Sequence, residues 1–144
     1  MKYKVSFLEE GDYVELCDWW KFWRFPVPPR EALPSDGLGG IKVSYTNEFK
    51  EEIDVCAGFL YSTNSSLCWL EFVVSNPRVR DKKVRQECLS LLIEDICLKA
   101  KNNGYGAVFS SLKSESLINK YKEVGFHCSE SSTTELTLNL NNWK

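Results

Sequence analysis

The sequence predicts one domain over residues 1–144, of the mixed α/β (α+β) class, with a mostly antiparallel central sheet and helices on both faces. Short alternating runs joined by turn residues in the first half are typical of antiparallel hairpins. In the second half a strand, a long amphipathic helix and another strand indicate a right-handed β-α-β unit. The expected order of elements is β-α-β-β-β-α-β-α-β.

The predicted strands are short runs that are apolar throughout or alternate between apolar and polar residues. They cover residues 2–8, 41–45, 55–62, 67–74, 107–111 and 133–140. In the last run Leu136, Leu138 and Leu140 share one face by alternation, and we expect that face to point inward.

Three amphipathic segments predict helices, and their ends carry the expected signals. The first covers residues 12–23 and ends before a proline-rich loop over residues 25–40. The second covers residues 83–102 and is followed by Asn-Gly, a common C-terminal stop. The third covers residues 115–124, with Ser114 as its expected N-cap.

The composition excludes several classes of protein. A hydrophobic fraction of 43% allows a full core, and no apolar run approaches the roughly 20 residues of a membrane span. The N-terminus does not resemble a signal peptide. Six cysteines without a Cys-x-x-Cys pair, and His127 as the only histidine, predict reduced thiols and no metal site. We therefore expect a cytoplasmic protein.

Charge is concentrated in one segment. The net charge of -2 argues against general affinity for nucleic acid, which needs a basic excess. Between Arg78 and Arg85, however, five basic residues accompany one acid, Asp81. This segment lies between an apolar strand and a helix, where backbone amides point outward and bind anions. The sequence therefore predicts one local anion site, although a solvated, charged helix start is the alternative.

The segment Tyr121-Lys122-Glu123-Val124-Gly125-Phe126, placed after this order of elements, resembles the GCN5-related N-acetyltransferase (GNAT) superfamily. The resemblance implies acetyl-CoA as co-substrate, with its pantetheine arm on the fourth strand and its pyrophosphate in the following loop. It places Tyr121 where the family protonates the leaving thiolate; an amphipathic core residue is the alternative. Residues expected at the cofactor are Phe72, Val73, Val74, Arg78, Arg80, Asp81, Lys82, Lys83, Val84, Arg85 and Ser114.

The loop departs from the family pattern, because Asp81, Lys83 and Arg85 stand where the family keeps glycines. Glycine allows the backbone to approach phosphate closely. Two outcomes are open. The basic side chains bind the phosphates themselves, or the site has changed or lost its cofactor.

Glu71 lies in the apolar fourth strand and shares a face with Trp69 and Val73. Burial would raise its pKa towards that of a general base for an acceptor amine. The alternative is a structural hydrogen-bonding role.

An aromatic cluster from Trp19 to Phe25 occupies the region that shapes the acceptor site in the superfamily. We expect Trp20 and Trp23 in the core. The residues predicted to bind the acceptor, which would be planar or anionic, are Trp19, Phe22, Arg24, Phe25 and Arg30. A nucleobase would fit by stacking.

The predicted function is an acyl-CoA-dependent N-acyltransferase, monomeric or homodimeric, that acts by direct attack of an amine. The Trp-rich run and the Pro-x-Pro-Pro segment are similar to small superfamily members encoded by bacteriophages, which would place the protein in the host cytoplasm. Two alternatives remain: a diverged binding module of phage origin, and a nucleobase-modifying enzyme on the same scaffold.

Overall fold

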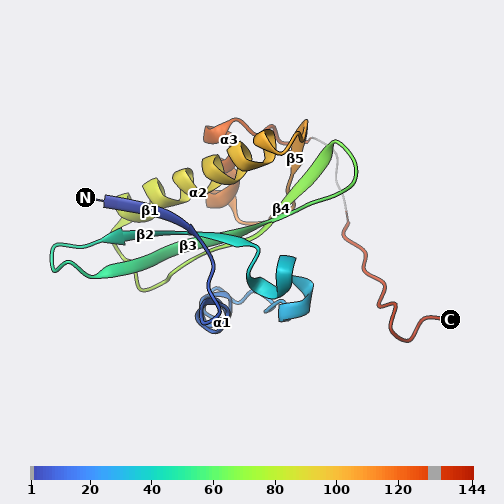
Figure 1. Cartoon of the computed structure of the whole chain (residues 1–144), viewed down its shortest axis with the longest axis horizontal. Coiled ribbons are helices and arrows are strands. Elements are labelled where there is room, and N and C mark those ends of the chain that lie inside the picture. Colours follow the sequence, from blue (N-terminus) through green and yellow to red (C-terminus); the bar gives the residue numbers. More distant parts are fainter. Residues whose placement is uncertain (1, 130–133) are drawn as a thin grey trace.

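Each strand of the sheet lies beside its neighbour in the chain, in the order β1-β2-β3-β4-β5 (Figure 1). The structure, a computed structural model, describes residues 2–129 and 134–144. Helices α2 and α3 cover one face of the sheet, and α1 lies on the other face with two 3-10 turns (Figure 1). The predicted fold class is therefore confirmed.

Most observed boundaries lie within a few residues of the predicted ones. The strands are β1 (Lys2–Phe7), β2 (Gly40–Thr46), β3 (Glu52–Tyr61), β4 (Leu67–Ser75) and β5 (Ala107–Phe109). The helices are α1 (Asp12–Phe22), α2 (Lys82–Asn102) and α3 (Glu115–Val124), and the 3-10 turns η1 (Arg30–Ala32) and η2 (Pro34–Gly37) lie in the predicted loop. No helix within the described residues is both long enough and apolar enough to cross a membrane.

β1 to β4 are antiparallel, whereas β5 runs parallel to β4 and pairs with it over three residues only, Leu67 to Trp69. β4 also carries an irregularity. Its register with β3 shifts by one residue across Gly58, and Phe72 has a φ of 58°, which non-glycine residues seldom adopt. A Cβ on Gly58 would lie 2.9 Å from Val73 Cγ2, so the bulge requires glycine opposite it. The carboxyl-terminal half of β4 is therefore bent and has no partner on the β5 side.

Two apolar clusters hold the helices on the sheet. Under α2 and α3, the cluster includes Val84, Cys88, Leu92, Ile96 and Tyr121. Under α1, it includes Leu16, Trp19, Trp20, Phe59 and Val74. The buried residues of α2 thus lie on one face, as expected for the amphipathic helix that the sequence predicts.

The last predicted strand is wrong over the residues that the structure describes. Thr133 lies outside the described residues, and residues 134–140 form no strand. Leu136 is 91% exposed, and Leu138 and Leu140 are exposed as well rather than inward. The tail leads away from the sheet (Figure 1). Alternation identifies side chains that would share a face, but a strand also needs a hydrogen-bonded neighbour.

Candidate active site

Glu71 lies on β4 just beyond the last pair with β5, where the two strands no longer share a ladder. Its Oε1 accepts a hydrogen bond from the backbone amide of Ser111 at 3.0 Å. Burial raises the pKa of this half-buried carboxyl, and the bond from Ser111 partly offsets that rise. A carboxylate that is held in place and has a raised pKa can accept a proton near neutral pH.

Tyr121 approaches the same place from α3. Ser114 begins this helix, with its Oγ accepting from the amide of Leu117 at 3.4 Å. The side chain of Tyr121 is only 4% exposed, and its ring packs edge-on against Phe126 with centroids 5.0 Å apart. Burial raises the pKa of the phenol, a hydrogen bond with Ser110 lowers it, and the charge of Glu71 raises it. Tyr121 therefore stays protonated at neutral pH, close to both residues.

Ser110, which was not predicted, connects Tyr121 to the backbone of β4 next to Glu71. Its Oγ donates to the carbonyl of Leu70, the residue before Glu71, at 2.6 Å. A hydrogen bond between the same hydroxyl and Tyr121 lowers the pKa of the phenol. The bond to Leu70 continues the contact between the two strands beyond their paired residues. A serine at a strand end carries no sequence signal for such a role, because its partners are about 40 residues away or on another element.

The three predicted cofactor residues that follow Glu71 lie in or beside the bulge. Phe72 and Val73 fall between the residues of β4 that pair with Phe59 and Ala57. The ring of Phe72 packs at 6.1 Å from Phe25 and 6.2 Å from Trp20, on the α1 side of the sheet. Val74 is buried in the cluster under α1. Their side chains are thus committed to packing, and their backbone is the part available to a ligand.

The loop after β4 is a closed turn built on Asn76. This buried side chain donates to the Asp54 carbonyl at 2.8 Å and accepts from the Arg78 amide at 3.0 Å, and the Asn76 carbonyl accepts from the Val79 amide at 3.2 Å. Two amides that could face an anion are therefore already satisfied inside the loop.

Asp81 caps α2. Its Oδ1 accepts from the amides of Lys83 at 3.0 Å and Val84 at 3.3 Å. A carboxylate of the chain thus occupies the first free donors of the helix, where the sequence predicted a cradle for pyrophosphate. The buried side chain of Val84 belongs to the core.

The five predicted bases do not converge on one point. Arg85 donates from Nη1 to the Val79 carbonyl at 3.3 Å, and Lys83 lies 3.9 Å from Glu87. The charge of Arg78 lowers the pKa of Glu15, a residue of α1. Arg80 and Lys82 are exposed and make no side-chain hydrogen bond or ion pair with the described part of the chain. The exposed Arg78 likewise makes no side-chain hydrogen bond or ion pair with the described part of the chain. The basic side chains free to meet an anion are therefore Arg78, Arg80 and Lys82, together with the weakly paired Lys83.

The aromatic cluster at α1 differs from the prediction in which tryptophans are buried and which are exposed. Trp19 is 4% exposed and belongs to the core with Trp20, whereas Trp23 is 47% exposed. Trp23 instead donates from Nε1 to the carbonyl of Ser75 at 2.9 Å, at the end of β4. Phe22 and Phe25 are exposed, as expected for an aromatic surface. Trp23 is the residue just after α1, so helical periodicity does not determine how deeply it is buried.

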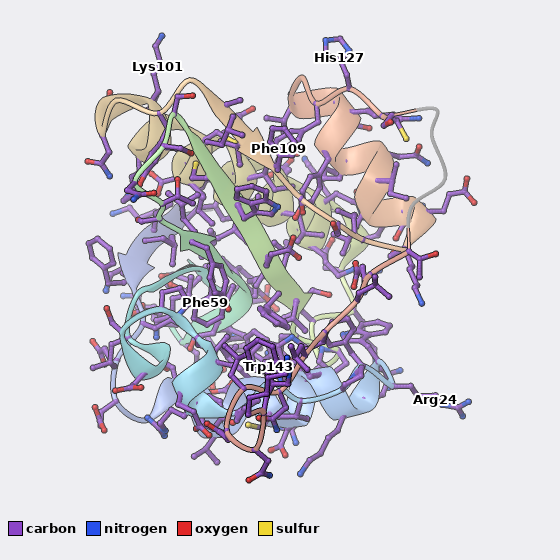
Figure 2. The ribbon with its side chains drawn as sticks, turned by 90° about the vertical axis from the view of Figure 1, so that its right-hand side faces the viewer. Arg24, Phe59, Lys101, Phe109, His127 and Trp143 are labelled. Carbon is purple, nitrogen blue, oxygen red and sulfur yellow. The ribbon has the colours of Figure 1, made fainter. Side chains whose placement is uncertain are left out.

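The predicted pair of Arg24 and Arg30 does not form a clasp. Arg24 follows the carboxyl end of α1 and points away from the protein (Figure 2). Arg30 stacks 4.6 Å over the ring of Tyr13 and lies 3.9 Å from Glu10, at the amino end of the same helix. An 11-residue helix separates them by about 16 Å.

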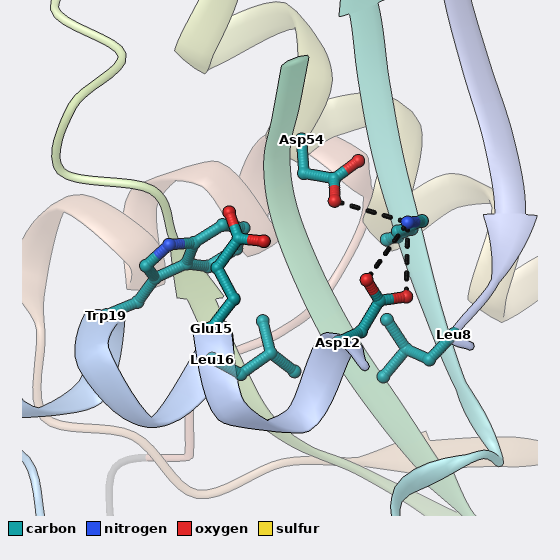
Figure 3. Close-up of a pocket in the computed structure, with 7 residues that line it drawn as sticks. Leu8, Asp12, Glu15, Leu16, Trp19 and Asp54 are labelled. Atoms are coloured by element: carbon teal, nitrogen blue, oxygen red, sulfur yellow. Dashed lines mark hydrogen bonds and ion pairs between the residues drawn. The ribbon is translucent and has the colours of Figure 1, made fainter. Parts of the chain in front are cut away.

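A second polar group lies under α1 (Figure 3). Lys42 Nζ lies 3.1 Å from Asp12 Oδ2 and 3.2 Å from Asp54 Oδ2, and the Glu15 carboxylate is within 4.8 Å of those of Asp12 and Asp54. The ammonium already sits between the two aspartates. We interpret this group as a structural ion-pair network.

No protein-family profile matches this chain, and no curated protein sequence matches it. Solved structures do. An acetyltransferase from Trypanosoma brucei has a TM-score of 0.60 at 18% identity, over 95% of this chain and 100% of that one. Glucosamine-6-phosphate N-acetyltransferase from Arabidopsis thaliana has a TM-score of 0.59 at 16% identity, over 94% of this chain and 99% of that one.

A third example is the N-acetylglutamate synthase of Neisseria gonorrhoeae, solved with coenzyme A and L-arginine. Its TM-score is 0.64 at 16% identity, and the match covers 92% of this chain and 29% of that one. This chain has the GNAT acetyltransferase fold. At the start of α2, where the sequence predicts an anion site, Asp81 accepts from the amides of Lys83 and Val84.

Proposed function

We propose that this protein is an acyl-CoA-dependent N-acyltransferase that acetylates an amine. The observation that carries the proposal is that Glu71 lies where β4 and β5 separate and is close enough for its charge to raise the pKa of the Tyr121 phenol. Ser110 is hydrogen-bonded both to the phenol and to the Leu70 carbonyl of β4, next to Glu71. A carboxylate and a neutral phenol at one point are the base and the acid that acyl transfer to an amine needs.

Glu71 is the proposed general base. Its raised pKa allows the carboxylate to take a proton from the attacking amine, directly or through one water. The Ser111 amide fixes one carboxylate oxygen, so the other is available to the acceptor. In the reaction a bond forms between the amine nitrogen and the acyl carbon, and the bond from that carbon to sulfur breaks.

Tyr121 is the proposed general acid. Its phenol is protonated at neutral pH and donates its proton to the departing sulfur, so a neutral thiol leaves. Ser110 positions the hydroxyl. No nucleophile of the protein is needed, since the two substrates react directly once they are held together.

The acyl-CoA would lie along the bent half of β4, from Phe72 to Val74, with its phosphates near the exposed Arg80, Lys82 and Lys83. The acceptor would enter from the α1 side. There Phe25 packs on Phe72, one residue from Glu71, and Phe22 packs edge-on against Trp23 at 4.9 Å. This aromatic surface favours an acceptor with a planar or apolar part beside its amine.

Calorimetric titration with acetyl-CoA and CoA tests the proposal first. Binding in the micromolar to millimolar range is expected. Thiol release from acetyl-CoA, measured with a panel of amines, aminosugars and lysine peptides, then identifies the acceptor class. The absence of binding at millimolar CoA would exclude the proposal.

A second candidate function is a binding module that has lost acyl transfer, favoured by the capped α2 amides. It predicts that no amine stimulates thiol release. It also predicts that Tyr121→Phe leaves every binding property unchanged.

A further inference from the structure

The carboxylate of Asp81 and a pyrophosphate group require the same donors. In a helix the first amides have no partner within the helix, and they are the groups an anion binds. Here the Lys83 and Val84 amides both donate to Asp81 Oδ1. An incoming phosphate oxygen must either displace that oxygen or bind beside a negative charge.

The rest of the loop offers few replacements. The Arg78 and Val79 amides are bonded to Asn76, which is itself anchored to β3 through the Val55 and Asp54 carbonyls. The Arg85 guanidinium is bonded to the carbonyl of Val79. The amides of Arg80, Asp81 and Lys82 are the ones in this turn without an acceptor in the described part of the chain.

We infer that Asp81 is an internal competitor of the pyrophosphate of CoA, and that it sets the affinity of this site for phosphate-containing ligands. The inference rests on the proposed function, because it assigns a regulator to the proposed acyl-CoA site. It predicts weak phosphate binding in the natural protein, with most of the affinity coming from the pantetheine arm on β4. It also predicts that one substitution restores a stronger phosphate site.

Asp81→Asn is the decisive variant. Asparagine is as good an N-cap as aspartate, so α2 keeps its cap while the negative charge disappears. Asp81→Ser provides a second neutral cap. The matched control is Glu94→Gln, which removes one negative charge from an exposed residue of the same helix, about 20 Å further along. Thermal unfolding of all variants verifies that the fold is retained.

Three probes separate the contributions. Inorganic pyrophosphate reports on the phosphate site alone, pantetheine on the arm alone, and CoA on both. Removing a unit charge next to the ligand is expected to tighten pyrophosphate and CoA binding roughly 10-fold in both Asp81 variants. Pantetheine binding should stay unchanged in every protein, and Glu94→Gln should bind all three probes as the natural protein does.

The outcomes distinguish this inference from the proposed function. Equal pyrophosphate affinity in the natural protein and both Asp81 variants would overturn the inference, and CoA binding in the same experiment would leave the proposed function intact. Tighter pyrophosphate binding in the Asp81 variants supports the inference. If those variants and the natural protein then failed to bind CoA, the proposed function would fall while the role of Asp81 stood.

Discussion

The backbone amide of Ser111 donates to Oε1 of Glu71 at 3.0 Å and so links the chain just after β5 to the half of β4 that has no partner on the β5 side. The two strands have stopped pairing at this point, with Trp69 and Phe109 as their last pair. The bond holds the carboxylate where the two strands separate.

Glu71→Gln should reduce kcat/KM for acyl transfer by about 100-fold, the order that general-base catalysis supplies. Glutamine keeps an oxygen for the Ser111 amide but cannot accept the proton. In the natural protein, acyl-transfer activity should rise as the pH passes through the raised pKa of Glu71, and the variant should lack that rise. Steady-state rates across pH check both points.

Stability provides the control for this variant. Because burial raises the pKa of Glu71 in the folded state, the protonated form is favoured there, and stability is lost as the pH rises through that pKa. Glu71→Gln should therefore be no less stable than the natural protein at pH 7 in urea unfolding. A variant that is fully active would remove Glu71 from the mechanism.

Tyr121→Phe should lower turnover by about 100-fold because the thiolate loses its proton donor. The ring and its contact with Phe126 remain, so the melting temperature should change little. Tyr61→Phe is the matched control. Its phenol also senses Glu71 and has a pKa raised by burial to about 12, but it donates to the Ala32 carbonyl. Equal losses in the two variants would contradict a specific role for Tyr121.

Lys42→Met should destabilise the fold by about 1–3 kcal/mol at neutral pH, since it leaves the Asp12 and Asp54 carboxylates without their shared cation. Burial already raises the pKa of Asp54 despite Lys42. Without the lysine that pKa rises further, so the loss should shrink as the pH falls and the carboxyl becomes protonated.

Urea unfolding of Lys42→Met at several pH values measures this effect, with Lys4→Met as the control. Lys4 forms a 3.4 Å pair with Glu52 in which both side chains are more than half exposed. Its loss should cost less than about 1 kcal/mol. Similar losses in the two variants would show that the cluster under α1 contributes no more than a surface pair.

The thiols should differ sharply in reactivity. Cys128 is exposed, whereas Cys56, Cys68 and Cys88 are buried, and burial raises the pKa of Cys88 to about 12. Ellman's reagent should therefore modify Cys128 fast in the native protein, and Cys128→Ser should abolish that phase. The three buried thiols should react only after denaturation. Their rapid modification in the native state would contradict the packing under α2 and α3.

Local signals account for what the sequence predicted well. Helix α3 has the predicted bounds because Ser114 and Gly125 mark its ends within a few residues of the apolar stripe. Asp81 was the exception. The N-cap preference of aspartate predicts its role, whereas the resemblance to a glycine-rich loop predicts phosphate binding at the same residue.

Features that depend on distant partners could not be predicted in the same way. The final strand failed because alternation in residues 134–140 says nothing of a neighbouring strand. The role of Ser110 depends on Leu70 and Tyr121, which lie on β4 and α3. Trp19 and Trp23 were exchanged because α1 ends at Phe22, and Trp23 instead bonds to the distant Ser75 carbonyl.

The three-residue pairing of β5 has a consequence for how the protein opens. Glu71 belongs to the long antiparallel ladder, whereas Tyr121 reaches the site only while β5 and α3 stay docked. Segments with few ladder bonds exchange their amide hydrogens through local opening, before the whole protein unfolds. Hydrogen exchange should therefore be faster in residues 107–124 than in β3, and mild denaturant should abolish activity before the sheet is lost.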